Sequence, residues 1–288
     1  MIVTRFAPSP TGQLHLGHLH SALLGWHLAR HGRGRFLLRI EDIDPTRCRA
    51  EFEHSLIEDL HWAGLDWDGP VRRQSEHLDT YQAGMHRLSA LGLIYPCFCS
   101  RKDIATAISA PHGSDGPVYP GTCRDLPIDQ AAERQARGDP YALRFNSRRA
   151  AGLTGPLAFT DQLQGRIAVN PDLLADVVLA RRDAPASYHL CVTLDDDLQG
   201  VTLVTRGVDL LSATHVHRQL QAALGLAVPD YRHHLLLTNA AGQRLAKRDK
   251  SLSLRQMRET GLTPAAVRQL AGENEILQMR SNLSLSST

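Results

Sequence analysis

The sequence predicts an α/β protein built on a parallel sheet. The first part of the chain alternates short apolar, β-branched runs with amphipathic stretches, in the order strand, helix, strand, helix. A buried-strand pattern returns late in the chain, after an insert punctuated by Cys, Pro and Gly. Alternating strands and helices form parallel sheets, and ligands bind at the carboxyl ends of their strands.

The N-terminal elements follow from apolar spacing and turn residues. The run IVTRF is ended by APSPTG, and the run FLLRI leads into an acidic turn that Pro45 closes. Leucines spaced for one helical face follow the first turn. The predicted elements are strands at 2–6 and 36–40 and helices at about 14–30, 48–63 and 71–95.

The second part of the chain combines an insert with further strands and helices. Residues 96–125 are rich in Cys, Pro and Gly, and a polar, basic loop, NAAGQRLAKRDK, follows the last predicted strand. Thr263 and Pro264 are the residue types of a helix N-cap and first turn. The predicted strands are 141–146, 165–170, 188–207 and 233–238, and helices are expected at about 212–224 and from 264.

The bulk composition is that of a globular protein, with 42% hydrophobic residues, 22% charged residues and a net charge of +2. That charge does not by itself indicate nucleic-acid binding. The N-terminus lacks the basic region and apolar run of a signal peptide, and no run approaches the ~20 apolar residues that span a bilayer. We therefore expect a cytoplasmic protein that does not contact a membrane.

Cysteine spacing indicates a metal site. An odd count of five cysteines in such a chain argues against a disulfide framework. Cys97 and Cys99 stand one residue apart and Cys123 follows, a spacing that suits tetrahedral Zn²⁺, although buried free thiols are the alternative. The candidates for a fourth ligand are Tyr119, His112 and a distant residue such as Cys191.

The segment RFAPSPTGQLHLGH, residues 5–18, has the organisation of a nucleotide site. A strand, a Pro/Gly turn and a helix start present unpaired N–H groups and a partial positive charge to phosphate. His15 and His18 lie on one face of the first helical turn and can donate hydrogen bonds to phosphate, and Gly17 leaves room for a base. The alternative is that both histidines only cap the helix or face solvent.

Four blocks, in order, resemble the glutamyl branch of the class I aminoacyl-tRNA synthetases. PSPTGQLHLGH resembles the HIGH signature, and RIEDIDPTR at 39–47 and GVTLVTRGVDLL at 200–211 resemble the next two blocks. GQRLAKRD at 242–249 stands where the KMSKS loop of that family belongs. The resemblance runs from residue 5 to about 250, which is most of the chain.

The resemblance implies a Rossmann-like parallel sheet of the class I type, an inserted zinc-bearing subdomain and a short helical C-terminal part. We expect a first Rossmann half with the HIGH-like motif, then an acceptor-type insert with the zinc, then a second Rossmann half, then the KMSKS-like loop with the helical C-terminal part. The expected boundaries of these four segments are 1–95, 96–170, 171–230 and 231–288.

A glutamate site is the first functional implication. A guanidinium binds a carboxylate bidentately and a carboxylate binds an ammonium, so Arg5 and Arg206 suit the γ-carboxylate and Glu41 the α-amino group. Alternatively, either arginine could pair with Asp42, Asp44 or Asp209, and Tyr188 could belong to the core. The glutamate-binding residues that the resemblance implies are Arg5, Phe6, Ala7, Pro8, Ser9, Glu41, Tyr188 and Arg206.

An ATP site is the second implication, with Mg²⁺ on the pyrophosphate oxygens. Attack on the α-phosphate needs positioning and charge stabilisation more than covalent chemistry. The resemblance assigns this role to His15, Gly17, His18 and Lys247. The KMSKS-like loop departs from the family pattern at its first lysine and at its serine, and its residues here are Arg244, Leu245, Ala246, Lys247 and Arg248.

The resemblance also bears on the metal and on the RNA. CFC and YPGTC match the Cys-x-Cys…Tyr-x-x-x-Cys zinc knuckle of short glutamyl-synthetase-like proteins, which implies one structural zinc per chain held by Cys97, Cys99, Tyr119 and Cys123. The chain stops soon after the KMSKS-like loop, so we expect no anticodon-binding domain. The implied relatives are the short paralogues that activate L-glutamate without tRNA and esterify it to the queuosine at the wobble position of tRNA(Asp).

The expected partners are therefore L-glutamate, ATP and the anticodon loop of tRNA(Asp), with the chain as a monomer. Three alternatives remain open. The chain could be an inactive, RNA-binding or regulatory paralogue. The departures from the KMSKS pattern at Arg244 and Ala246 favour this alternative. It could be a catalytic fragment of a glutamyl-tRNA synthetase, or a nucleotidyl-transferring enzyme of the same fold that acts on a small molecule.

Overall fold

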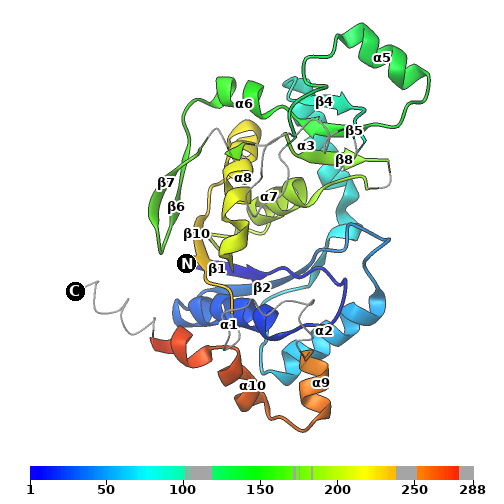
Figure 1. The fold of residues 1–288 in the computed structure, drawn as a ribbon. Helices are drawn as coiled ribbons and strands as arrows, with labels where there is room; N and C mark the ends of the chain where they lie inside the picture. The colour runs from blue at the N-terminus through cyan, green and yellow to red at the C-terminus, as the bar shows by residue number, and fades with distance from the viewer. Residues whose placement is uncertain are drawn as a thin grey trace.

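Two sets of parallel strands meet edge to edge at the centre of the molecule (Figure 1). The structure is a computed structural model that describes residues 1–100, 103, 119–170, 173–174, 176–182, 184–237 and 252–278. The first set is β1 (Val3–Phe6), β2 (Arg35–Ile40) and β3 (Arg72–Arg73), all parallel. The second contains β9 (Leu203–Gly207), β10 (Asp230–His234) and β6 (Ala158–Asp161), with β7 (Gly165–Ala168) antiparallel at its edge.

The two sets join between β1 and β9. The Thr202 backbone N–H donates to the Val3 carbonyl oxygen at 2.9 Å, and the Val3 N–H donates to the Thr202 hydroxyl at 2.9 Å. Helix α1 (Leu16–His31) follows β1, and helix α8 (Leu211–Leu224) follows β9. Figure 1 shows α1 below the strands and α8 above them. The β1–β9 junction is therefore a topological switch point, where α/β sheets bind ligands.

Alternation along β2 separates the two faces of the sheet. Phe36, Leu38 and Ile40 pack into the core that contains α1 and the C-terminal helices. Leu37 packs on the opposite face, and Arg39, fully buried, points the same way toward α7 (Tyr188–Leu198). The sheet thus places charged side chains beneath α7 and α8.

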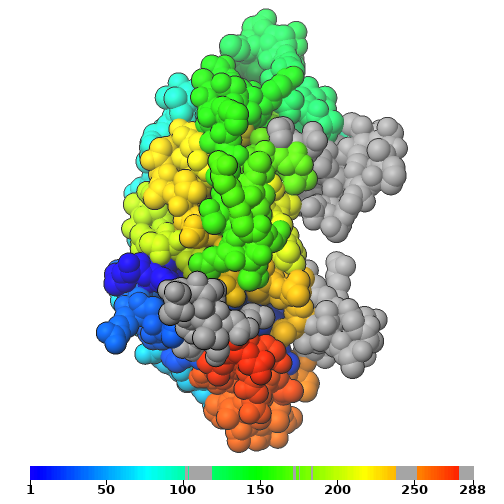
Figure 2. All heavy atoms as spheres, turned by 90° about the vertical axis from the view of Figure 1, so that its left-hand side faces the viewer, coloured from blue at the N-terminus to red at the C-terminus, as the bar shows by residue number. Residues whose placement is uncertain are grey.

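The remaining elements surround this sheet. The helices below it and at the C-terminal end are α2 (Ala50–Trp62), α9 (Leu254–Glu259) and α10 (Pro264–Leu270). On the other side lie η1 (Gln74–His77), α3 (Leu78–Ala90) and η3 (Val208–Leu210). The insert contains β4 (Ile94–Cys97), β5 (Ala142–Phe145) and β8 (Val178–Arg181) as an antiparallel sheet, with α5 (Ile128–Ala136) and α6 (Ser147–Thr154). In Figure 2 the green α6–β7 region forms a band between the insert and the orange-red C-terminal helices.

Three strand or helix predictions were wrong in part. Residues 188–198 form a helix, although a run of β-branched and apolar residues predicted a strand over 188–207. Helical spacing was misjudged because seven consecutive side chains of α7, residues 190–196, are buried, which hides the amphipathic period. The helix predicted at 71–95 begins only at Leu78, between β3 and β4, and the last strand ends at His234 rather than at 238.

Other local predictions are confirmed. The first two strands and helices lie close to their predicted bounds, and Thr263 caps α10 with Pro264 at the first position. The Thr263 hydroxyl accepts the Ala266 N–H at 3.3 Å. Within the described residues, no helix combines the length and the apolar character that a bilayer crossing requires.

Candidate functional site

A cavity of about 480 Å³ opens at the carboxyl ends of β1, β2, β9 and β10. It gathers every predicted glutamate- and nucleotide-site residue that the structure describes. These are Arg5, Phe6, Ala7, Pro8, Ser9, His15, Gly17, His18, Glu41, Tyr188 and Arg206. The predicted KMSKS-like residues 244–248, which include Lys247, lie outside the described residues, as does His112.

Sequence reasoning missed the part of the cavity wall that follows β9 and β10. The residues concerned are Thr205, Gly207, Asp209, Leu210, His234, Leu236 and Leu237, together with Thr11, Gly12 and Ser21. Gly207 is needed for close approach, because a Cβ there would lie 2.5 Å from the Asp209 carboxylate and 2.7 Å from Leu236. The block GVTLVTRGVDLL contains several of these positions, so the ends of its strand were the available signal.

His15 and His18 shape the start of α1. The Nδ1 atom of His15 accepts the Gly17 N–H at 3.1 Å, and the Nδ1 atom of His18 accepts the His15 N–H at 3.3 Å. The two rings stack with their centroids 3.8 Å apart. Because Nδ1 accepts in each ring, the neutral tautomer carries its proton on Nε2. The histidines therefore cap the helix and also line the cavity.

Glu41 is held at the end of β2 by the N-terminal turn. Its backbone N–H donates to the Pro8 carbonyl oxygen at 3.0 Å. The carboxyl is buried, and burial raises its pKa to about 7, although Arg39, 3.7 Å away, and Arg5 oppose the rise. A cationic ligand would favour the ionised form, so the site is suited to an ammonium group.

Arg5 and Arg39 share one carboxylate on α7. The Nε atom of Arg5 and the Nη2 atom of Arg39 each lie 2.9 Å from the same oxygen of Asp196. Burial alone would raise the pKa of Asp196, but the two guanidinium groups outweigh burial and hold that pKa below its usual range. Arg5 thus pairs with Asp196, an aspartate that was not among the three considered from the sequence. The pairing fixes Arg5 at the cavity wall.

Arg206 has different surroundings. Its guanidinium donates to the Tyr188 hydroxyl at 3.4 Å, to Thr214, and to ring nitrogens of His217 and His233 at 3.2 Å each. Among the described residues, no carboxylate forms a salt bridge with it. Tyr188 lines the cavity rather than lying wholly in the core.

A second, smaller cavity adjoins the first. It measures about 280 Å³ and shares Ser9, Thr11, Glu41 and Tyr188 with the larger one. Charged side chains from the acidic turn and from β8 also line it, namely Asp44, Arg47 and Arg181. Two ligands can therefore meet beside Tyr188 and Glu41.

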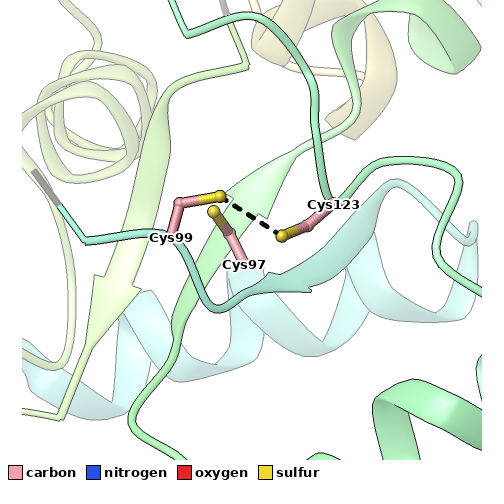
Figure 3. A group of neighbouring side chains, drawn as sticks. All are labelled: Cys97, Cys99 and Cys123. Atoms are coloured by element: carbon pink, nitrogen blue, oxygen red, sulfur yellow. Dashed lines mark hydrogen bonds between the residues drawn. The ribbon is translucent and has the colours of Figure 1, made fainter. Parts of the chain in front are cut away.

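Three cysteines of the insert converge, as the sequence predicted (Figure 3). Their sulfur atoms all lie within 4.8 Å of one another, and Cys99 and Cys123 are 3.5 Å apart. Cys97 and Cys99 come from the end of β4, and Cys123 from a separate loop. Burial and the neighbouring thiols raise the pKa of Cys99 to about 12, so this side chain is a neutral thiol unless a bound cation favours the thiolate.

The cluster fits a tetrahedral zinc ion. At about 2.3 Å from each sulfur, such an ion separates thiolates by roughly 3.8 Å, which is near the observed spacing. The Tyr119 hydroxyl accepts the Cys123 N–H at 2.8 Å and lies 3.3 Å from the Cys97 sulfur and 3.9 Å from that of Cys99. The Tyr119 oxygen is therefore the candidate for the fourth zinc ligand. Cys191 is buried in the core around α3, α7 and α8 instead.

Cys97→Ser is expected to remove zinc and lower the melting temperature, without changing any residue of the cavity wall. Thiolate loss weakens a closed zinc site, whose binding energy contributes to folding. Zinc per chain, measured by mass spectrometry, checks this, with Cys48→Ser as the matched control because Cys48 lies outside the cluster. Unchanged zinc in Cys97→Ser would contradict the site, and Tyr119→Phe tests the fourth ligand in the same assay.

Sequence comparisons place the chain among known proteins. A family model described as class I tRNA synthetases (E and Q), catalytic domain, matches residues 1–273. The chain is 49% identical to the glutamyl-Q tRNA(Asp) synthetase of Rhodobacter capsulatus over 281 residues, which cover 94% of this chain and 100% of that one. It is 38% identical to the glutamate–tRNA ligase of Aquifex aeolicus, with 92% of this chain and 55% of that one covered.

A comparison of structures agrees. The crystal structure of glutamate-tRNA synthetase from Elizabethkingia anophelis matches with a TM-score of 0.73 and 29% sequence identity. The match covers 91% of this chain and 54% of that one, so the chain spans about half the length of that enzyme.

Proposed function

Since the chain belongs to the catalytic-domain family of class I glutamyl- and glutaminyl-tRNA synthetases, we propose that it activates L-glutamate with ATP, without tRNA, and transfers the glutamyl group to the queuosine at the wobble position of tRNA(Asp). The observation that supports this proposal is that one cavity is lined both by Arg5, Glu41 and Arg206 and by the two histidines, His15 and His18. Cationic and anionic groups there match those of glutamate, and the helix start matches a triphosphate.

In the first step, the α-carboxylate oxygen of glutamate attacks the α-phosphorus of ATP. The bond to the bridging oxygen breaks and pyrophosphate leaves with the electron pair, so glutamyl-adenylate forms. Glu41 holds the α-ammonium, and the positive charge of Arg206, with its remaining Nη2–H, holds the γ-carboxylate. The Nε2–H groups of His15 and His18 donate to the phosphate as charge grows in the transition state. Mg²⁺ bound to ATP neutralises charge on the pyrophosphate oxygens.

In the second step, a hydroxyl oxygen of the queuosine attacks the adenylate carbonyl carbon. AMP leaves with the electron pair of the C–O bond and the hydroxyl proton passes to solvent or to the phosphate. The adjoining cavity suits the incoming base, because it shares Glu41 and Tyr188 with the cavity assigned to glutamate. Arg47 and Arg181 there suit the RNA backbone.

The other parts of the proposal follow from the family. Lys247, in the KMSKS-like loop, would contact ATP. Segments 1–95 and 171–230 would form the two halves of the catalytic domain, and residues 96–170 the insert that meets the anticodon loop. The zinc, held by the three cysteines and Tyr119, would stiffen that insert without taking part in the reaction. We place the enzyme in the cytoplasm as a monomer.

Glutamate-dependent ATP–pyrophosphate exchange without tRNA tests the first step. We expect rapid exchange with glutamate and far slower exchange with glutamine or aspartate. Absence of exchange at high enzyme concentration would favour an inactive, RNA-binding paralogue. Charging then tests the second step: labelled glutamate should appear on queuosine-containing tRNA(Asp) and not on the same tRNA without queuosine. Label on tRNA(Glu) would instead favour a glutamyl-tRNA synthetase catalytic domain.

A further inference from the structure

The two arginines of the glutamate site differ in how their charge is balanced. Arg5 is ion-paired with Asp196 at 2.9 Å. Arg206 is equally buried, with 6% of its surface exposed, yet every side-chain partner that the structure gives it is uncharged or an aromatic ring. A buried guanidinium without a carboxylate partner is unusual, because burial penalises an unpaired charge.

The partners of Arg206 come from three neighbouring elements. Strand β10 supplies His233 and the Tyr231 ring, whose centroid lies 5.4 Å from the guanidinium carbon. Helix α8 supplies Thr214 and His217, and α7 supplies Tyr188. These residues form a neutral shell around the guanidinium.

Hydrogen bonding fixes the tautomer of His233. Its Nδ1 atom lies 2.7 Å from a carboxylate oxygen of Asp161, on β6, so Nδ1 carries the proton and donates to Asp161. Nε2 therefore has a lone pair, and it accepts from Nε of Arg206 at 3.2 Å. The imidazole ring stands between the Asp161 carboxylate and the guanidinium, so Arg206 is not paired with that carboxylate.

A second chain of hydrogen bonds fixes His217. An arginine can only donate, so Nδ1 of His217, 3.2 Å from Nη1 of Arg206, is an acceptor. Nε2 of the neutral ring then carries the proton and donates to Nδ1 of His189 at 3.1 Å. Each ring in this chain is therefore uncharged in the hydrogen-bonded arrangement that the structure has.

The acid–base properties agree with this geometry. Burial and the charge of Arg206 lower the pKa of His189 to about 4 and that of His233 also to about 4, the latter against the opposing effect of Asp161. Burial and Arg206 likewise lower the pKa of His217 well below its ordinary value. At neutral pH, the shell adds no charge to Arg206 and removes none.

We propose that His217 and His233 are positioning residues for the substrate side chain: each accepts a hydrogen bond from Arg206 through an uncharged ring nitrogen, which fixes the guanidinium while leaving its positive charge for the γ-carboxylate. The inference rests on the proposed activation of glutamate. It assigns the preference for glutamate over glutamine to the absence of a carboxylate from the described shell around Arg206.

The physical reason is a difference in charge. A carboxylate in the shell would neutralise Arg206 and leave little gain in binding a second anion. With neutral acceptors, the unpaired guanidinium gains a charge-assisted contact with glutamate, whereas the uncharged amide of glutamine gains much less and brings N–H groups against N–H groups.

Two variants of nearly equal shape test the inference. The side-chain oxygen of asparagine occupies about the position of the histidine Nδ1, and aspartate adds only a charge there. In exchange assays we expect His217→Asp to raise the KM for glutamate about tenfold or more with a small change in kcat, and to lower the glutamate-to-glutamine ratio of kcat/KM about tenfold. His217→Asn should keep that ratio within roughly threefold of the wild-type value.

Controls separate charge from folding and from the proposed activity. His86→Asp, on the exposed face of α3, introduces the same charge away from the site and should leave the ratio unchanged. Equal ratios for the Asn and Asp variants of His217, with both folded by circular dichroism, would overturn the inference. If the wild-type protein shows no exchange, the proposed function fails, and glutamate and glutamine binding to the same variants by calorimetry tests the inference. Absence of glutamate binding to the wild type would overturn both.

Discussion

Glu41→Gln is expected to raise the KM for glutamate roughly a hundredfold in ATP–pyrophosphate exchange at pH 8, because a charge-assisted bond to the α-ammonium is replaced by a neutral one. Glu41 and Asp209 are the carboxylates on the described part of the cavity wall, and Glu41 stands between Arg5 and Tyr188. An unchanged KM would show that the ammonium binds elsewhere.

The pH dependence of glutamate binding follows from the same residue. Burial raises the pKa of Glu41 to about 7, so the carboxyl loses its charge as the pH falls through that value. We expect the wild-type KM for glutamate to be constant above pH 7 and to rise about tenfold per unit below it. Glu41→Gln should lack this dependence. A wild-type KM that stays flat between about pH 5.5 and 8 would contradict the assignment.

The free energy of unfolding should depend on pH in the opposite sense to glutamate binding, and should fall as the pH rises. A carboxyl whose pKa is higher in the folded than in the unfolded chain favours folding while it is protonated, and this contribution is lost as the pH rises from about 4.5 to about 7. Glu41→Gln should therefore melt at a higher temperature than the wild type at pH 8, with a smaller difference at pH 5. At pH 8 the wild-type protein would then be less stable than the Glu41→Gln variant, because its buried carboxylate is charged and has no cationic ligand bound.

Arg39→Met is expected to lower the free energy of unfolding by about 3–5 kcal/mol, measured by urea denaturation, because removing one partner leaves buried charge uncompensated. Arg39 is fully buried and lies 2.9 Å from Asp196, 3.7 Å from Glu41 and 3.9 Å from Asp195. Its Nη1 also donates to Gln199 at 2.8 Å. The loss would loosen α7 against β2, and with it the support of Arg5.

Two companion variants make this prediction specific. Arg255→Met removes an exposed pair with Glu259 on α9 and should leave the unfolding free energy nearly unchanged, since such pairs are screened by solvent. The double variant Arg39→Met with Glu41→Gln should recover part of the lost stability, because Glu41 loses its ion-pair partner when Arg39 is removed, whereas Asp196 keeps Arg5. A wild-type-like midpoint for Arg39→Met would contradict a structural role for this network.

Local patterns in the sequence determined much of the site. The strand, the Pro/Gly turn and the helix start at residues 5–18 lie as predicted, since each depends on neighbours along the chain. The spacing of Cys97, Cys99 and Cys123 likewise predicted that their side chains come together, as they do in the structure. The class I synthetase fold that the ordered blocks implied is confirmed by the family match and by the structural comparison. Those blocks also contain His15, His18, Glu41 and Arg206, which line one cavity in the structure.

Tertiary structure decided how those residues are held. Asp196, in the run DDD, was predicted to belong to a strand, and it is a buried partner of Arg5 because residues 188–198 form a helix over the sheet. Arg5 and Asp196 stand 191 residues apart, and Arg39 and Asp196 stand 157 apart. His217 and His233 carry no local signal at all. Packing between distant segments sets burial, ionisation and hydrogen-bond partners, and no window of neighbouring residues contains that information.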